Sequence, residues 1–339
     1  MIVARIIAIL VLAASCLPDV ARAQTQQRMA LIIGNSDYDS DGVVAPQREP
    51  AAGMQYDLVN PANDVQAVAS LLGETYNRPQ PMLNMDFDAM STALAQFAVD
   101  VSRADAAADA ANRPRPVVVI YYAGHGMEYA NTNYLIPVGA RLPAPEEMQN
   151  VPANAARQRL QGRVIAVDDV LSLFEERGDG VTVLVIDACR NNPWARRARG
   201  GRTSAVEQGL ATITPVGSLI VALSASPGAV ASDGQGQTLS PFAQAFVEIG
   251  ARRDLSFVDA FSSIVERVVL TTPNRQRPWM VGSPSGRFCL LQCASSRLSQ
   301  PEIGPEAGSL EDWRTWVGDG RIYFEVDRFN LNASARGAR

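Results

Sequence analysis

The chain has 339 residues, a formal net charge of -5, one histidine and 30 basic residues, all of them arginine. The absence of lysine excludes Walker-type phosphate loops, pyridoxal Schiff bases and Ser-Lys hydrolases, and a single histidine excludes zinc sites built on two or three imidazoles. The acidic balance argues against non-specific nucleic-acid binding, so we expect no nucleic-acid partner. Any catalysis that uses an imidazole must use His125.

The first 23 residues have the pattern of a secretory signal peptide. Arg5 precedes the apolar run 6–14, and small residues follow up to Ala23, as in a charged region, a hydrophobic region and a cleavage site. The run is too short to span a bilayer. We therefore expect a periplasmic or secreted protein with no membrane span after removal of the signal. A lipid anchor at Cys16 and a buried strand are the alternatives.

Removal of this segment leaves three cysteines, Cys189, Cys289 and Cys293. The last two are close in sequence and either form a small disulfide in an oxidising compartment or remain buried thiols. Cys189 is then the odd thiol, and an odd thiol in an exported protein has to be considered as a reactive group.

Apolar runs and amphipathic segments alternate along the chain. Continuous apolar runs predict buried strands at residues 29–33, 117–122, 181–186 and 218–223. Apolar spacings of three and four predict helices from Asn63, over 87–101, from Asp168 or Asp169, over 241–251 and over 257–270. This order predicts an α/β fold with a mostly parallel central sheet and helices on both faces.

The segments between these elements are predicted to be loops. They are the long polar stretch 36–56 and residues 140–163. The alanine-rich segment up to Arg115 is predicted to be the frayed end of the second helix and a linker. Beyond residue 295, a Pro-, Gly- and Ser-rich stretch leads to a small apolar appendage at Trp313–Phe329.

The chemistry is predicted at the ends of two strands, because ligands of open parallel sheets bind at the carboxyl ends of the strands. The run 117–122 leads to Gly124, His125 and Gly126, and the run 181–186 leads to Cys189. An imidazolium lowers the pKa of a neighbouring thiol, so Cys189 can act as a nucleophile with His125 as its acid–base partner. The backbone amides of Gly126 and Cys189 are predicted to hold the oxyanion. Taken singly, a structural histidine and a small buried cysteine are the alternatives.

These motifs resemble the caspase and metacaspase group of cysteine peptidases, and the bacterial caspase-domain proteins most. The resemblance extends from about Met29 to Phe288 and includes Ala30–Asn35, Asn60–Asp64, Tyr121–Gly126, Tyr134–Pro137, Asp187–Asn191 and Leu223–Ser226. It implies the caspase-haemoglobinase α/β sandwich, with Cys189 as the nucleophile and His125 as its partner. It implies no cofactor, and a calcium requirement cannot be read from the sequence, where we assign no metal ligand.

The resemblance also divides the chain. It implies a peptidase domain at 28–292, between the signal at residues 1–23 and the appendage at 295–339 that the sequence pattern predicts. Within the peptidase domain, a large-subunit-like part extends to about residue 200 and a small-subunit-like part covers about 215–292.

Three residues are predicted to set the specificity. Asp187, two residues before Cys189, and Asp64 match acidic pocket residues of metacaspases, and Ser224 matches a third pocket position. A carboxylate in a partly desolvated pocket favours a guanidinium. We therefore expect cleavage after Arg or Lys, in protein or peptide substrates with basic residues. Alternatively, Asp64 only stabilises the dipole of its helix.

The loop Arg190–Arg202 is rich in arginine. In the family this region joins the two subunits and is often self-cleaved, which predicts self-processing here; a solvated basic loop is the alternative. For the whole chain, the alternative to an endopeptidase is a non-catalytic caspase-fold module that binds partners.

Overall fold

The computed structural model describes residues 26–45, 48, 55–148, 151–189, 218–226, 231–234, 236–273, 275–282, 284 and 286–294. The predicted signal segment, the Arg190–Arg202 loop and the appendage lie outside the described residues. All described residues belong to one compact unit, which ends at Ala294.

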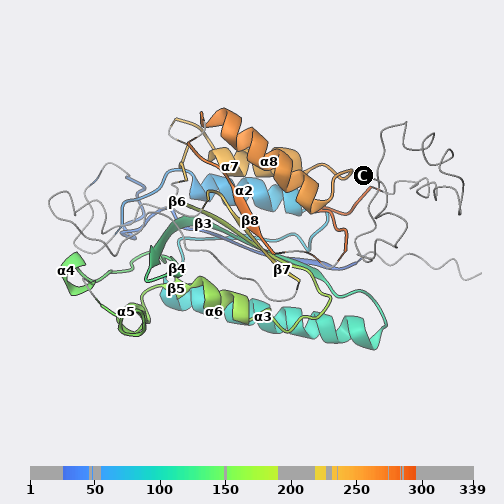
Figure 1. Ribbon diagram of the computed structural model, residues 1–339, viewed down its shortest axis with the longest axis horizontal. Helices are drawn as coiled ribbons and strands as arrows, with labels where there is room; N and C mark the ends of the chain where they lie inside the picture. Colours follow the sequence, from blue (N-terminus) through green and yellow to red (C-terminus); the bar gives the residue numbers. More distant parts are fainter. Residues whose placement is uncertain are drawn as a thin grey trace, which may run out of the picture. The chain divides into compact units, whose positions relative to one another are not determined.

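The centre of this unit is a mostly parallel sheet (Figure 1). Its strands lie in the order β2 (Pro81–Leu83), β1 (Arg28–Gly34), β3 (Val117–Tyr129), β6 (Thr182–Cys189), β7 (Leu219–Leu223) and β8 (Trp279–Val281). The first five are parallel to one another, and β8 pairs antiparallel with β7. β4 (Thr132–Leu135) and β5 (Ile165–Ala166) form a small antiparallel extension at the end of β3.

Helices cover both faces of the sheet (Figure 1). One face carries α2 (Pro61–Leu72), α7 (Pro241–Gly250) and α8 (Phe257–Thr271), and the other carries α3 (Phe87–Ala110) and α6 (Val167–Ser172). Side chains on alternate positions of the central strands face opposite helix layers, which gives two hydrophobic clusters, one on each side of the sheet. The predicted α/β fold with a mostly parallel sheet is confirmed.

Some boundaries differ from the prediction. α3 continues to Ala110 through the alanine-rich segment, because alanine has the highest helix propensity. The predicted loop 140–163 contains two short helices, α4 (Pro145–Met148) and α5 (Ala153–Leu160). They enclose a third apolar cluster with the β3–β4 hairpin, so tertiary packing stabilises helices too short to form alone.

A buried ion pair joins α3 to the sheet. The Arg177 guanidinium donates from Nε and Nη2 to the two oxygens of Asp105 at 2.9 and 2.7 Å. It also donates to the carbonyls of Pro116 and Val181 and to the hydroxyl of Thr182. This arginine therefore fixes the starts of β3 and β6 relative to α3.

The carboxyl end of the domain is tied to its beginning. Cys289 and Cys293 form a disulfide with a Cα–Cα distance of 5.2 Å, which decides between the two alternatives for these cysteines. Arg28 Nη1, at the start of β1, donates to the carbonyls of Cys289 and Leu290 at 3.1 and 3.0 Å.

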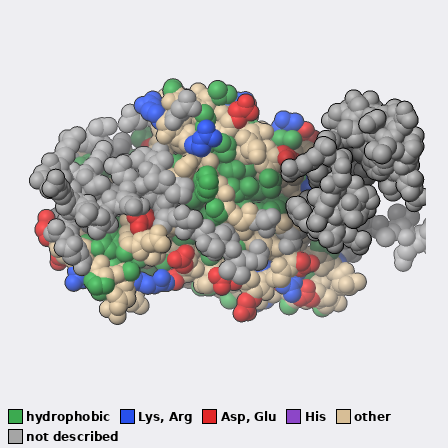
Figure 2. All heavy atoms as spheres, in the orientation of Figure 1, with side chains coloured by type: hydrophobic (Ala, Val, Ile, Leu, Met, Phe, Trp, Pro, Cys, Tyr) green, Lys and Arg blue, Asp and Glu red, His purple; other side chains and the backbone are tan. Residues whose placement is uncertain are grey.

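On the face shown in Figure 2, acidic and basic side chains are interspersed and hydrophobic side chains gather between them. A face with mixed charges does not steer ligands of one sign from a distance. Among the described residues, no helix combines the length and apolar character needed to cross a membrane.

Candidate active site

His125 and Cys189 lie opposite each other on neighbouring parallel strands. The β3–β6 register ends with the pair His125–Cys189, and Cys189 is the last residue of β6. Neighbouring strands lie about 4.8 Å apart. The sequence predicted His125 just beyond the end of its strand, but the residue lies within β3. β3 leaves β6 after His125 and continues by pairing with β4 from Gly126 onward. The two predicted catalytic residues therefore meet where the parallel sheet ends.

Tyrosines hold His125 in place. The His125 backbone N–H donates to the Tyr38 hydroxyl at 2.6 Å, and the two rings pack with centroids 4.5 Å apart. The Tyr122 hydroxyl donates to the His125 carbonyl at 2.8 Å. The ring Nε2 lies 2.7 Å from the carbonyl oxygen of Tyr56. Since a carbonyl only accepts, Nε2 carries a hydrogen, and Nδ1 is the ring nitrogen that can exchange a proton.

The two glycines beside His125, Gly124 and Gly126, differ in their surroundings. A Cβ atom on Gly124 would lie 2.6 Å from the Tyr122 hydroxyl and 2.7 Å from the Tyr38 hydroxyl, so a side chain here would displace the tyrosines that hold His125. Gly126 begins the pairing with β4, opposite Leu135. Its amide therefore lies at the point where the backbone leaves the parallel sheet.

The predicted pocket residues Asp64 and Asp187 line one small cavity next to Gly124. Asp187 comes from β6, and Asp64 comes from the first turn of α2. Asp64 is 2% exposed and Asp187 is 6% exposed, so neither is an ordinary surface carboxylate. The cavity holds about 10 Å³, which is room for about one water molecule.

Ser240 connects the two carboxylates. Its hydroxyl donates to Asp187 Oδ2 at 2.5 Å, and its backbone N–H donates to Asp64 Oδ1 at 2.8 Å. The same hydroxyl accepts from the backbone N–H of Ala243 and so caps α7. A single serine thus starts a helix and orients both acids. Tyr121 adds a second hydroxyl donor to Asp187 at 3.3 Å.

A third carboxylate, Asp233, also lines the cavity. It accepts from the backbone N–H groups of Val59 and Asn60 at 2.9 and 3.4 Å. Ser224, the remaining predicted pocket residue, follows β7 and is buried, and its backbone N–H donates to the Ile186 carbonyl at 3.0 Å. It does not line the cavity, and its buried hydroxyl makes no hydrogen bond among the described residues.

Burial raises the pKa values of these three acids. Burial, followed by the negative charge of Asp187, raises the pKa of Asp64 to about 9. Burial raises the pKa of Asp187 to about 6, while the hydrogen bond from the Ser240 hydroxyl lowers it. Burial also raises the pKa of Asp233. A bound cation favours the ionised form of a carboxyl. The three carboxyls therefore form a site where ionisation and the binding of a cation stabilise each other.

Sequence reasoning missed Ser240 and Asp233. Ser240 precedes Pro241, which is a recognisable helix start, but nothing local shows that the cap also bonds two distant acids. Asp233 lies in an irregular segment, and only the fold brings it beside α2. Asn60, within a motif noted above, donates its amide to the carbonyls of Asp233 and Gly234 and fixes that segment.

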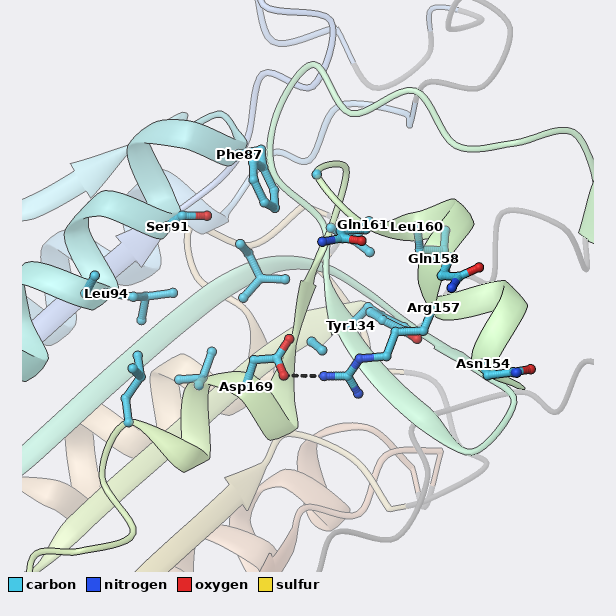
Figure 3. A pocket seen from close by; sticks show the side chains of 17 residues that line it. Phe87, Ser91, Leu94, Tyr134, Asn154, Arg157, Gln158, Leu160, Gln161 and Asp169 are labelled. Atoms are coloured by element: carbon cyan, nitrogen blue, oxygen red, sulfur yellow. Dashed lines mark hydrogen bonds and ion pairs between the residues drawn. The ribbon is translucent and has the colours of Figure 1, made fainter. Parts of the chain in front are cut away.

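A larger cavity of about 750 Å³ lies elsewhere, between α3, α5 and α6. Figure 3 shows Phe87, Ser91 and Leu94 on one side and the ion-paired Arg157 and Asp169 on the other. Neither His125 nor the acids around Ser240 line it. We therefore assign the candidate site to the small acidic cavity and not to this one.

Comparisons with known proteins identify the family of this chain. The family model of the caspase domain matches residues 27–289. A human protein, mucosa-associated lymphoid tissue lymphoma translocation protein 1, is 24% identical over 165 residues, which cover 49% of this chain and 15% of that protein. The match thus spans a small part of that relative's length.

Among solved structures, caspase-1 from Spodoptera frugiperda matches with a TM-score of 0.46 and 12% identity, over 80% of this chain and 94% of that one. The family model covers most of the chain, and it contains both strand ends and the acidic cavity. The chain therefore belongs to the caspase-domain family of cysteine peptidases.

Proposed function

We propose that the protein is a cysteine endopeptidase that cleaves after Arg, and also after Lys, with Cys189 as the nucleophile and His125 as the acid–base group. The observation that carries the proposal is the pairing of His125 with Cys189 at the sheet edge where the acidic cavity lies. A dyad beside a pocket for a basic side chain is the minimum that such a reaction requires.

The chemistry follows from the roles of the two residues. The Cys189 thiolate attacks the carbonyl carbon of the scissile bond, and the carbonyl electrons move to the oxygen, where the amides of Gly126 and Cys189 would stabilise the charge. When the tetrahedral species collapses, the C–N bond breaks and His125 Nδ1 donates a proton to the leaving amine. A water molecule, deprotonated by His125, then hydrolyses the thioester and regenerates the thiol. The Tyr56 carbonyl supports the imidazolium through Nε2.

Charge supports the preference for a basic residue. Asp64, Asp187 and Asp233 surround the cavity, and an Asp side chain of a substrate would add a fourth carboxyl to three that already repel one another. A guanidinium would instead neutralise them and form bidentate bonds. The cavity of about 10 Å³ has to widen to admit it, so we expect binding and opening of the pocket to be coupled.

Export and self-processing are further parts of the proposal. The disulfide Cys289–Cys293 is of the kind found in oxidising compartments, which supports removal of the signal and a periplasmic or secreted location. Arg190–Arg202 follows the proposed nucleophile directly and offers arginines that match the acidic pocket. We propose cleavage within this loop by the enzyme itself.

A fluorogenic panel with Arg, Lys, Asp or Asn at the scissile position tests the proposal. We expect turnover of the Arg substrate above all others, and loss of all activity in Cys189→Ala. Cys289→Ala with Cys293→Ala is the matched control, since it removes cysteines far from the site. Preference for Asp contradicts the pocket argument. No turnover of any substrate, with and without calcium, favours a non-catalytic caspase-fold module that binds partners.

Mass spectrometry of the purified chain tests self-processing. Cleavage after an arginine in 190–202, absent from Cys189→Ala, is the expected result. An intact chain in an active preparation contradicts a need for processing.

A further inference from the structure

Gln276 carries a buried amide in the connection between α8 and β8. Only 1% of the residue is exposed, and it lies between the end of α8 at Thr271 and the start of β8 at Trp279. Most glutamines lie at the surface, and a buried one needs hydrogen bonds for both ends of its amide. The partners of Gln276 therefore show what this side chain connects.

The Gln276 amide joins two segments that follow β7. Nε2 donates to the Ser224 carbonyl at 2.8 Å, and Oε1 accepts from the backbone N–H of Ser232 at 3.0 Å. A carbonyl needs a donor and an N–H needs an acceptor, so the two partners fix the orientation of the amide. Ser224 follows β7 directly, and Ser232 lines the acidic cavity. Gln276 therefore holds the chain that lines the cavity against the end of β7.

Asp233, next to Ser232, is held between two amides. Residues 231–234 belong to no helix or strand, so side-chain bonds replace the bonds of a sheet. On one side, Gln276 bonds to Ser232. On the other side, Asn60 donates from Nδ2 to the Asp233 carbonyl and from its backbone N–H to the Asp233 carboxylate. The place of this carboxylate in the cavity thus depends on both amides.

Gln276 is itself anchored to α8. Its backbone N–H donates to the Thr272 hydroxyl at 3.2 Å, and this hydroxyl donates to the Val268 carbonyl in the last turn of the helix at 2.7 Å. The carbonyl of the next residue, Arg277, accepts from the Ser226 hydroxyl at 2.9 Å. Because the connection is bound at both points, the amide has a defined position.

The place of Asp233 matters more for a guanidinium than for an ammonium group. A guanidinium is planar, and its N–H groups point in fixed directions that match a carboxylate only in a narrow range of geometry. An ammonium is a compact charge whose three donors rotate to meet their acceptors. A displaced carboxylate therefore weakens the binding of Arg more than the binding of Lys, whereas a change in charge affects both alike.

We propose that Gln276 is a positioning residue that sets the preference for Arg over Lys, by holding Ser232 and Asp233 where the carboxylate meets a guanidinium. Gln276 does not line the cavity, so it acts through these two residues and not by contact with the substrate. The proposal rests on the proposed function in one respect, namely that the acidic cavity receives the basic side chain.

Exchange of the amide for an apolar chain of similar length tests the proposal. We define the selectivity ratio as kcat/KM for the Arg substrate divided by kcat/KM for the Lys substrate. In Gln276→Met this ratio should fall about three- to tenfold, as for the loss of one positioning hydrogen bond. The fall should arise from KM, with kcat for the Arg substrate unchanged, because the pocket binds substrate and transition state alike. An unchanged ratio overturns the proposal.

Two controls separate positioning from stability. Gln244→Met makes the same exchange at an exposed position of α7, and Asp105→Asn removes the counter-charge of buried Arg177 on the other face of the sheet. Both should keep the wild-type selectivity ratio, and a fall in either one equal to that in Gln276→Met rejects a role in positioning. If Gln276→Met does not fold, Thr272→Val carries the test. It removes the hydroxyl that anchors Gln276 and should lower the ratio at least about twofold, so a wild-type ratio in this variant also contradicts the proposal.

Binding without turnover separates this proposal from the proposed function. Calorimetry on the full chain with butylguanidinium and with pentylammonium compares the two side-chain groups in ligands that have no peptide bond. The guanidinium should bind more tightly, and this preference should shrink in Gln276→Met. A smaller preference in the variant, without turnover of any substrate by the wild type, rejects the endopeptidase and keeps the role of Gln276. Turnover of the Arg substrate, with the same preference in both proteins, rejects that role and keeps the endopeptidase.

Discussion

The Ser240 hydroxyl donates a hydrogen bond of 2.5 Å to the buried carboxylate of Asp187. This bond lowers the pKa of Asp187 against the effect of burial, which raises it. Since Ser240 is also the N-cap of α7, the start of a helix and the charge of the pocket depend on one side chain.

Ser240→Ala should cost about 2–3 kcal/mol of unfolding free energy. Loss of the cap contributes about 1 kcal/mol, and the weaker solvation of buried Asp187 contributes about 1–2 kcal/mol more. Urea unfolding measures the difference. The matched control is Ser256→Ala, which removes the N-cap of α8 beside an exposed carboxylate and should cost only about 1 kcal/mol. Equal losses for both variants contradict a role for Ser240 beyond capping.

Cleavage after Arg should become more efficient as the pH rises from about 5 to about 9. In the free pocket the pKa of Asp187 is raised to about 6 and that of Asp64 to about 9, so each pH increase ionises more of the groups that bind the guanidinium. The ratio of kcat/KM for the Arg substrate to kcat/KM for the Asn substrate should therefore rise with pH. Taking this ratio removes the effect of thiol titration, which is the same for both substrates. Asp64→Asn should remove the part of the rise above pH 7; an unchanged profile in this variant excludes Asp64 as the titrating group.

The stability of the protein should fall over the same range. The folded-state pKa of Asp64 lies above its value in an unfolded chain, so the stability that the bound proton confers is complete below about pH 4 and is lost as the pH rises toward 9. The loss from this group is up to about 1.4 kcal/mol per pH unit. Asp64→Asn should therefore gain stability relative to the wild type between pH 5 and pH 9 in urea titrations. Asp100→Asn, at an exposed aspartate of α3, should follow the wild type at every pH.

Asp105→Asn should destabilise the fold by about 3–5 kcal/mol, because it leaves the buried Arg177 guanidinium without a counter-charge. The exposed pair Arg103–Asp100 on the same helix is the comparison. Its loss in Asp100→Asn should cost less than about 0.5 kcal/mol. Thermal unfolding of both variants measures the contrast, and similar values for the two would show that burial does not determine the effect.

Gly124→Ala should lower activity much more than it lowers stability. The added Cβ would approach the Tyr38 and Tyr122 hydroxyls within 2.7 Å, so one of them has to move away from His125. We expect kcat to fall at least about tenfold, as for other small displacements of catalytic groups, with a changed His125 NMR signal. Gly162→Ala, where φ is +72° and no atom lies within 4 Å of the added Cβ, tests the effect of backbone strain alone at a glycine away from the site. Wild-type kcat in Gly124→Ala contradicts the role assigned to the two tyrosines.

The strands of the fold could be predicted because each carries its own signal. Val117–Tyr122 and Val181–Ile186 are apolar throughout, as buried parallel strands are. The same local signal placed His125 and Cys189 at the ends of these strands. The end of β3 could not be predicted in this way, since the strand continues to Tyr129 only because β4 folds back on it.

The pocket could be predicted only in part, because its members come from separate elements. Asp64 and Asp187 were found from motifs, whereas Ser240 and Asp233 have no local pattern that links them to a binding site. Gln276 is similar, since it bonds to the segments that follow β7 only after the chain has folded. Contacts between distant segments are a property of the tertiary structure, and a short-range pattern does not contain them.

The bonds from Arg28 to the carbonyls of Cys289 and Leu290 place the first strand next to the last residues of the domain. Both lie at the amino-terminal edge of the sheet, whereas His125 lies at the carboxyl-terminal edge. The two ends of the domain therefore lie close to each other, on the side of the sheet opposite to the site. A short linker between Gln26 and Ala294 should allow new termini to be opened in a surface turn, so the catalytic scaffold is suited to circular permutation.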